Sequence, residues 1–134
     1  MPLMLGVALA LSLSAGKLWQ EGRARLPDQT ISCGEPVAGC LLDGGGARLR
    51  FLSPVRAAQP FDVRIDGLTA QRVEIGFDMV GMEMGVRPQS LAKQADGSWQ
   101  VHAWLPACTQ GRRDWEGVVA VDGRRYRFRF VASG

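Results

Sequence analysis

Histidine is almost absent from the sequence, and so are the motifs of the common enzyme classes. The one histidine is His102, and no serine or cysteine motif lies beside it. No glycine-rich loop leads into a helix pattern, and the glycines at 44–46 are better explained as the tip of a hairpin. A hydrolase needs a nucleophile, a base and an orienting group, which this sequence does not supply. We therefore predict that the protein is not an enzyme.

The sequence also lacks a dense basic stripe. Its formal net charge of +3 comes mainly from arginine, but most arginines stand singly or alternate with apolar residues. This pattern is typical of solvated strand faces, and the pair Arg112-Arg113 is assigned to packing and solvation. A nucleic-acid groove needs clustered basic residues with aromatics between them. We expect no nucleic-acid partner.

No helix pattern of useful length follows the N-terminal segment, in which residues 2–16 carry no charge. The apolar run and the small residues at 14–16 fit an export signal with a cleavage site. The segment also reaches the lower limit of a membrane-spanning helix, with Trp19 where an interfacial aromatic would lie. We predict that residues 1–19 are a signal peptide or a membrane anchor, and that residues 20–30 are a polar linker.

The three cysteines are an odd number, which outside the cytosol suggests one disulfide and one remaining thiol. Cys33 and Cys40 are seven positions apart, and the segment between them contains proline and glycine to turn the chain. We predict that these two form a local bridge and that Cys108 stays free. The alternative is three reduced, buried cysteines in a cytosolic protein.

Four Asp-Gly pairs separate stretches that suit β-strands. This dipeptide is the strongest short hairpin signal, because both residues tolerate positive φ. The pairs lie at residues 43–44, 66–67, 96–97 and 122–123. The predicted strands cover residues 48–52, 61–65, 71–77, 99–105, 115–121 and 124–131. With a methionine-rich segment added, seven or eight short strands predict an all-β fold, an antiparallel immunoglobulin-like β-sandwich over residues 31–132.

The last predicted hairpin indicates which face meets the core. Tyr126, Phe128 and Phe130 alternate with arginines between positions 125 and 129. Successive side chains of a strand point to opposite faces, so the aromatic face is predicted to be buried and the arginine face solvated.

Three methionines lie within six residues, at Met79, Met82 and Met84. Thioether sulfur is a soft ligand that suits Cu(I). On an extended strand Met82 and Met84 would project from the same face, and two sulfurs on one face form half of a metal site. The alternative is that these methionines fill an irregular core beside small glycines.

Two further soft or borderline donors, His102 and Cys108, would lie near the methionines if the two segments paired as strands. Two thioethers carry no charge, so a thiolate from Cys108 would neutralise the cation. We predict a Cu(I) site made by Met82, Met84 and Cys108, with Met79 or His102 as an additional donor. The alternatives are an exposed or hydrogen-bonded histidine, and a cysteine that is buried or disulfide-bonded.

A non-enzymatic structural or interaction module with no metal is the rival functional class. Such a module would hold a membrane partner through a sheet edge or an apolar patch, and its methionines would be core residues. The solvent exposure of Met82 and Met84 distinguishes the two classes.

Four short motifs occur in order along the chain. They are Gly81-Met82-Glu83-Met84-Gly85, Asp96-Gly97-Ser98-Trp99, Leu105-Pro106-Ala107-Cys108 and Arg113-Asp114-Trp115. Over residues 31–131 this series resembles small membrane-associated bacterial proteins that look like distant relatives of the FixH-like and YtkA-like β-sandwiches of copper handling and cytochrome oxidase assembly.

The resemblance implies an exported, membrane-tethered domain on the periplasmic side of the inner membrane, associated with the membrane through its N-terminal segment. It also implies a metallochaperone that carries Cu(I) through Met82, Met84 and Cys108. The implied partner is a membrane protein or a copper-accepting protein.

Overall fold

The computed structural model describes residues 28–43, 45–56, 58–82, 87–106 and 112–133. The predicted signal peptide or anchor at residues 1–19 lies outside this part of the chain. All elements in the described part are strands, as the all-β prediction requires. Within the same ranges, no helix has the length and apolar character that crossing a membrane requires.

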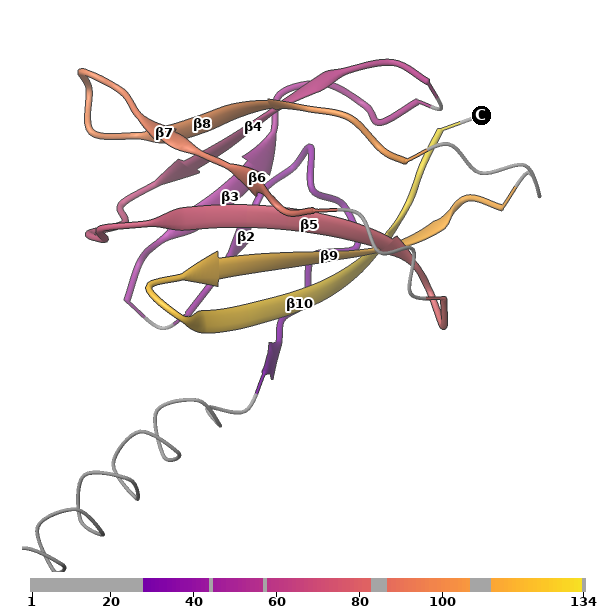
Figure 1. Cartoon of the computed structure of the whole chain (residues 1–134), viewed down its shortest axis with the longest axis horizontal. Helices are drawn as coiled ribbons and strands as arrows, with labels where there is room; N and C mark the ends of the chain where they lie inside the picture. Colours follow the sequence, from indigo (N-terminus) through magenta and orange to yellow (C-terminus); the bar gives the residue numbers. More distant parts are fainter. Residues whose placement is uncertain (1–27, 44, 57, 83–86, 107–111, 134) are drawn as a thin grey trace, which may run out of the picture.

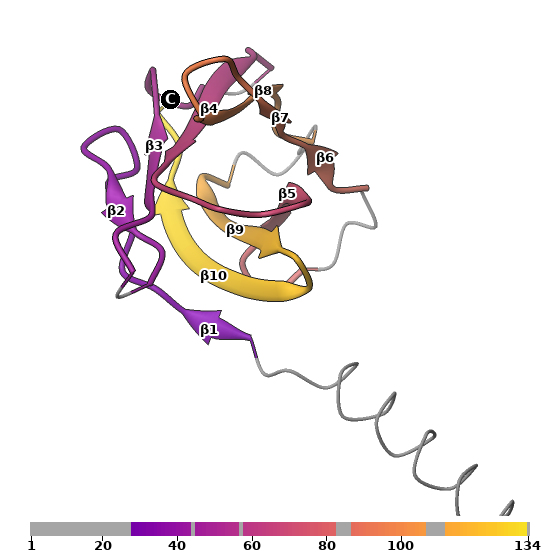
Figure 2. The same ribbon diagram turned by 90° about the vertical axis from the view of Figure 1, so that its left-hand side faces the viewer.

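The strands form two five-stranded sheets that face each other (Figures 1 and 2). Sheet A has the order β1-β10-β9-β5-β6, and sheet B has the order β2-β3-β4-β8-β7. The strands are β1 (Gln29–Thr30), β2 (Cys40–Leu41), β3 (Arg48–Phe51), β4 (Phe61–Asp66), β5 (Val73–Met79), β6 (Gln89–Ser90), β7 (Ala92–Lys93), β8 (Trp99–Ala103), β9 (Asp114–Val121) and β10 (Arg124–Val131).

The sheet edges account for the difference between seven or eight predicted strands and the ten found in the described residues. All four edge strands, β1, β2, β6 and β7, have two residues each. A two-residue strand has no alternation that a sequence pattern can reveal. Strand β1 even lies inside the predicted linker. Short edges of this kind protect a sheet against pairing with other chains.

One pair of strands departs from the predicted antiparallel arrangement. β1 runs parallel to β10, with Gln29 opposite Tyr126 and Thr30 opposite Arg127. The other strand pairs are antiparallel. Asp28 precedes β1 and lies 2.6 Å from the Arg127 guanidinium, so an ion pair holds the entering chain against β10.

Three Asp-Gly pairs lie wholly within the described residues: those at 96–97 and 122–123 form hairpins as predicted, and the one at 66–67 does not, whereas Gly44 of the fourth pair lies outside this part of the chain. Asp122 and Gly123 have φ values of 48° and 88° and join β9 to β10, as a type I′ turn requires. Gly67 also has positive φ, at 73°, but β4 lies in sheet B and β5 in sheet A. The predicted hairpin at residues 66–67 is therefore wrong. The dipeptide specifies that the chain changes direction. It does not specify which strand the strand after the turn will pair with.

The core between the sheets contains all five phenylalanines of the chain. Phe51 and Phe61 come from sheet B, and Phe77, Phe128 and Phe130 come from sheet A. The Phe51 ring centroid lies between 5.0 and 6.3 Å from the other four. Aromatic pairs at such spacings stabilise a core beyond the area that they bury. The predicted aromatic face of β10 is confirmed as buried.

Gly117 leaves space for one of these rings. It lies opposite Phe128 in the β9–β10 ladder. A Cβ at this position would come within 2.4 Å of the Phe128 ring, and that ring is completely buried. A side chain at residue 117 therefore displaces a phenylalanine that has nowhere to move.

We expect Gly117→Ala to lower the free energy of unfolding by about 1–3 kcal/mol, the usual cost of overpacking a core. Chemical denaturation measures this loss. Gly76→Ala is the matched control, because Gly76 is on the neighbouring strand and a Cβ there meets nothing closer than 3.9 Å. The control should change stability by no more than about 0.5 kcal/mol. Equal effects of the two substitutions would contradict the steric explanation.

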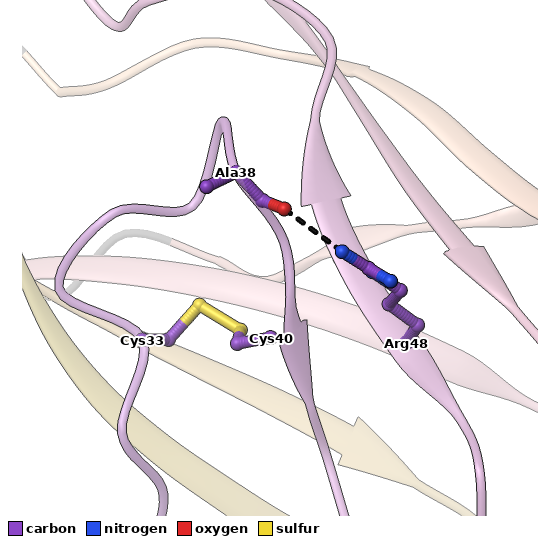
Figure 3. The surroundings of a disulfide bond; sticks show 4 residues. All are labelled: Cys33, Ala38, Cys40 and Arg48. Atoms are coloured by element: carbon purple, nitrogen blue, oxygen red, sulfur yellow. Dashed lines mark hydrogen bonds between the residues drawn. A yellow bond between two sulfur atoms is a disulfide. The ribbon is translucent and has the colours of Figure 1, made fainter.

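Cys33 and Cys40 form a disulfide, with their Cα atoms 5.4 Å apart, as predicted (Figure 3). The loop between them is fixed from β3, where the Arg48 guanidinium donates to the Ala38 carbonyl oxygen at 3.0 Å. The bridge joins the segment after β1 to strand β2, and so it ties the chain leaving sheet A to the edge of sheet B. The third cysteine, Cys108, lies outside the described residues.

We expect alkylation of the denatured, unreduced protein to label one thiol, at Cys108, and reduction to raise the number to three. Cys108→Ser should give no label before reduction. Replacing both Cys33 and Cys40 with alanine should cost about 2–3 kcal/mol of unfolding free energy, because the bridge closes a short loop. Label on Cys33 before reduction would overturn the assignment.

Candidate functional site

Strand β5 ends at Met79, and the chain then turns sharply. The Met82 amide donates to the Met79 carbonyl oxygen at 3.0 Å, and Gly81 has a φ of 77°. A glycine with positive φ in the third position is typical of a type II turn. The predicted extended strand through the methionine segment is therefore wrong at Met82. The reason for placing Met82 and Met84 on one face no longer applies, and Met84 lies outside the described residues.

The two described methionines of this segment have different environments. Met79 is 1% exposed and belongs to the core between the sheets. Met82, on the turn, is 37% exposed. Met79 thus has the core role that the alternative interpretation gives it, whereas the Met82 residue is partly exposed to solvent.

His102 lies on β8 in sheet B. Its Nδ1 atom is 2.8 Å from the Asp62 carboxylate, which is directly opposite it on β4. Both side chains are largely exposed. The structure therefore places His102 on a different sheet from Met82, in the hydrogen-bonded surface role that the sequence left as its alternative.

Arg112 fixes the methionine turn to the start of β9. Its guanidinium donates to the Val80 carbonyl oxygen at 2.9 Å, and it also donates twice to the Asp114 carboxylate, at 2.9 and 2.5 Å. The Val80 amide donates to the Asp114 carbonyl oxygen at 3.2 Å. Both main-chain groups of Val80 are thus held. No sequence pattern indicates this role, because Arg112 and Val80 are 32 positions apart and the group that accepts the hydrogen bond is a main-chain carbonyl oxygen.

The Asp114 carboxylate neutralises Arg112 beside the turn. The hydrogen bond from Arg112 is the largest cause that lowers the pKa of Asp114 below its ordinary value, and the charges of Arg112 and Arg129 act in the same direction, against desolvation. Asp114 is therefore ionised at neutral pH, and the turn carries no excess positive charge from this pair.

Among the described residues, no group of three or more histidine, cysteine, aspartate or glutamate side chains could hold a metal ion. Met82 is the one predicted sulfur ligand among these residues that is exposed to solvent. A single thioether binds Cu(I) only with help from other donors. Cys108 and Met84, the two predicted to give that help, lie outside the described residues.

No protein-family model, curated protein or solved structure matches the chain.

We expect Asp114→Asn to destabilise the protein at pH 7 and to have progressively less effect as pH falls. A carboxyl group whose folded pKa is depressed contributes stability above its unfolded pKa, about 3.9, and loses it as pH falls through the lower folded value. Denaturation of both proteins between pH 7 and pH 2 measures the difference. Arg112→Gln should flatten the same pH dependence. A pH-independent difference between wild type and Asp114→Asn would contradict this.

Proposed function

We propose that the protein is an exported, membrane-associated Cu(I)-binding domain, a metallochaperone in copper handling or cytochrome oxidase assembly. Its metal ligands are Met82, Met84 and Cys108. One observation carries the proposal: the exposed Met82 thioether stands on a turn that Arg112 ties to the start of β9. The metal's destination is a membrane protein or another copper-accepting protein on the periplasmic side of the inner membrane.

The length of the chain supports the inclusion of Cys108. Cys108 precedes Arg112 by four residues, and Met82 follows Val80 by two. A fully extended chain spans at most about 3.6 Å per residue. Arg112 and Val80 are in contact, so the short segments that lead to Cys108 and to Met82 begin at the same place in the fold. The chain therefore has the reach to bring them to one metal ion.

The chemistry of the three donors favours Cu(I). Two thioethers supply soft donors without charge, and a thiolate balances the charge of the cation. The Cys33–Cys40 disulfide leaves Cys108 as the one cysteine able to supply the thiolate. Disulfides persist in oxidising compartments, which supports the exported location.

The order of strands supports an immunoglobulin-like sandwich, the fold that the resemblance to FixH-like and YtkA-like proteins implies. In that fold, strands A, B, E and D form one sheet and strands C, F and G the other. With β3 taken as strand A, the order β3-β4-β8-β7 corresponds to A-B-E-D, and β10-β9-β5 corresponds to G-F-C.

The two additional donors are less suited to this site. Met79 is enclosed by core side chains, and His102 is on the other sheet and bonded to Asp62. We therefore propose the three-ligand site without them. Met79→Leu, which conserves volume, becomes a useful control for changes at Met82.

An interaction module without metal is the second candidate. It is favoured by an apolar groove at the end of β10, beside which Val37 and Val131 are exposed. The core position of Met79 also agrees with it. The two candidates differ in whether the protein binds Cu(I) at all.

We expect an anaerobic Cu(I) titration against a competing chelator to show one bound ion, with weaker binding as pH falls because the Cys108 thiol must lose its proton. Met82→Leu should lower the affinity by roughly tenfold or more, and Cys108→Ser should lower it further and remove the pH dependence. Met79→Leu should leave the affinity unchanged. Full affinity in the Met82→Leu/Met84→Leu double variant would refute the site. Absence of binding by the wild-type protein would refute the function and leave the interaction module.

A further inference from the structure

Strand β10 has an uncovered stretch on its outer edge. The chain that enters through β1 bonds to this edge as far as Ile31, whose amide donates to the Arg127 carbonyl oxygen at 2.8 Å. Pairing on the same edge resumes at Ser133, whose amide donates to the Val55 carbonyl oxygen at 2.7 Å. No described residue covers the edge of β10 between these two contacts.

The geometry of the hairpin identifies the main-chain groups that face this gap. Val121 and Arg124 flank a two-residue turn and are paired with each other, so this pair exchanges its main-chain hydrogen bonds. Even-numbered residues of β10 therefore bond to β9, and odd-numbered residues direct their amide and carbonyl groups away from it. In the gap, these outward groups belong to Arg129 and Val131.

The gap begins where the chain turns away from β10. After Ile31, the chain leaves β10 and crosses to sheet B, where the Cys33–Cys40 bridge fixes it beside β2. Had the chain continued along β10, it would have covered Arg129 and Val131. The bridge closes the 34–39 loop (Figure 3), and residues 34–37 form one wall of a groove that Phe130 and Val131 of β10 also line.

A groove of about 480 Å³ lies between this wall and the strand. Its volume is in the range of pockets that hold small ligands or side chains, about 300–1,000 Å³. Phe51 and Phe130 are buried lining residues, and Pro36, Pro54 and Val55 also line it. The groove therefore offers an apolar site directly beside main-chain groups that no described residue pairs with.

The wall of the groove is preformed. The Pro36 carbonyl oxygen accepts from the Phe51 amide at 2.9 Å and from the Gly39 amide at 3.1 Å. Arg48 holds the Ala38 carbonyl oxygen, and the disulfide closes the loop. A ligand that enters the groove does not have to order this loop, which lowers the cost of binding.

The charges beside the groove favour an acidic occupant. On the outer face of β10, Arg125, Arg127 and Arg129 face two carboxylates, Asp28 and Glu116, which leaves one positive charge in excess. Arg56, exposed and bridged to Ser133, adds a second positive charge on the β10 side. Glu35 lies on the opposite side, in the loop.

We propose that an extended segment of a partner protein adds to β10 at this gap. Its main chain pairs with Arg129 and Val131 and continues the ladder that β1 begins. One of its apolar side chains enters the groove over Phe51 and Phe130, and neighbouring acidic side chains face Arg56 and Arg129. Strand addition combined with a side-chain pocket is an established way to recognise peptides. This proposal does not depend on Cu(I) binding.

The probe is an acetylated and amidated peptide with the sequence Glu-Val-Glu-Ile-Glu-Val, titrated into the ¹⁵N-labelled full chain. We expect saturable binding, with slowed hydrogen exchange at the Arg129 and Val131 amides. Val37→Ser, which alters an exposed residue lining the groove, should weaken binding by about fivefold. Leu41→Ser is the matched control, since Leu41 is exposed but does not line the groove, and it should leave binding unchanged.

Two peptide controls test the parts of the proposal separately. Complete N-methylation of the peptide should abolish binding, because it removes the main-chain donors. Replacement of its glutamates by lysines should weaken binding, because it reverses the charge. Equal binding of the N-methylated peptide would overturn strand addition, and so would an absence of saturable binding. Protection of Arg129 and Val131 that rises with protein concentration alone would show that a second copy fills the gap, and it would overturn the partner segment.

Discussion

The contact between Phe51 and the four other phenylalanines holds the two sheets together. Phe51 projects from β3 in sheet B, and three of its four aromatic neighbours project from sheet A. The other features of the fold depend on this contact. Gly117 is needed to make room for Phe128, and the groove beside β10 has its depth because Phe51 and Phe130 form part of its lining. Buried aliphatic residues of both sheets, among them Leu49, Ile65 and Ile75, pack in the same core, and the Cys33–Cys40 bridge adds a covalent link.

The ion pairs on the outer faces have a different role. Arg127 lies between Asp28 and Glu116, and Arg64 lies between Asp66 and Asp96. Exposed pairs of this kind stabilise a protein weakly, by about 0–1 kcal/mol each. In this protein the ion pairs serve mainly to hold segments of the chain in place. Asp28 guides the entering chain to β10, and Arg112 fixes the turn that carries Met82.

The sequence predicted those parts of the fold that depend on local chemistry. Alternation identified both strands of the β9–β10 hairpin and their buried face, and Asp122-Gly123 identified the turn between them. Two misses have one cause. Residues 66–67 direct the chain into the other sheet, and the β5 strand stops at Met79, because of packing against segments distant in the sequence. Local patterns contain no information about such partners.

The candidate site was predictable to a smaller extent. The residue type indicated a soft donor at Met82, and its exposure agrees with that role. The core position of Met79 and the Asp62 bond of His102 depend on strand pairing, which the sequence did not reveal. The role of Arg112 could not be predicted from the sequence. One of its partners is a carbonyl oxygen distant in the sequence, and the other is a carboxylate two residues away, a neighbour that many surface arginines have.

The Cys33–Cys40 bridge makes the loop beside β10 depend on the oxidation state of two sulfur atoms. When the bridge is reduced, the 34–39 loop keeps its hydrogen bonds to Phe51 and Arg48 of β3 but loses the covalent link between the segment after β1 and strand β2. The wall of the groove would therefore be held most firmly where the bridge is oxidised, and the groove beside β10 would respond to the redox conditions around the protein.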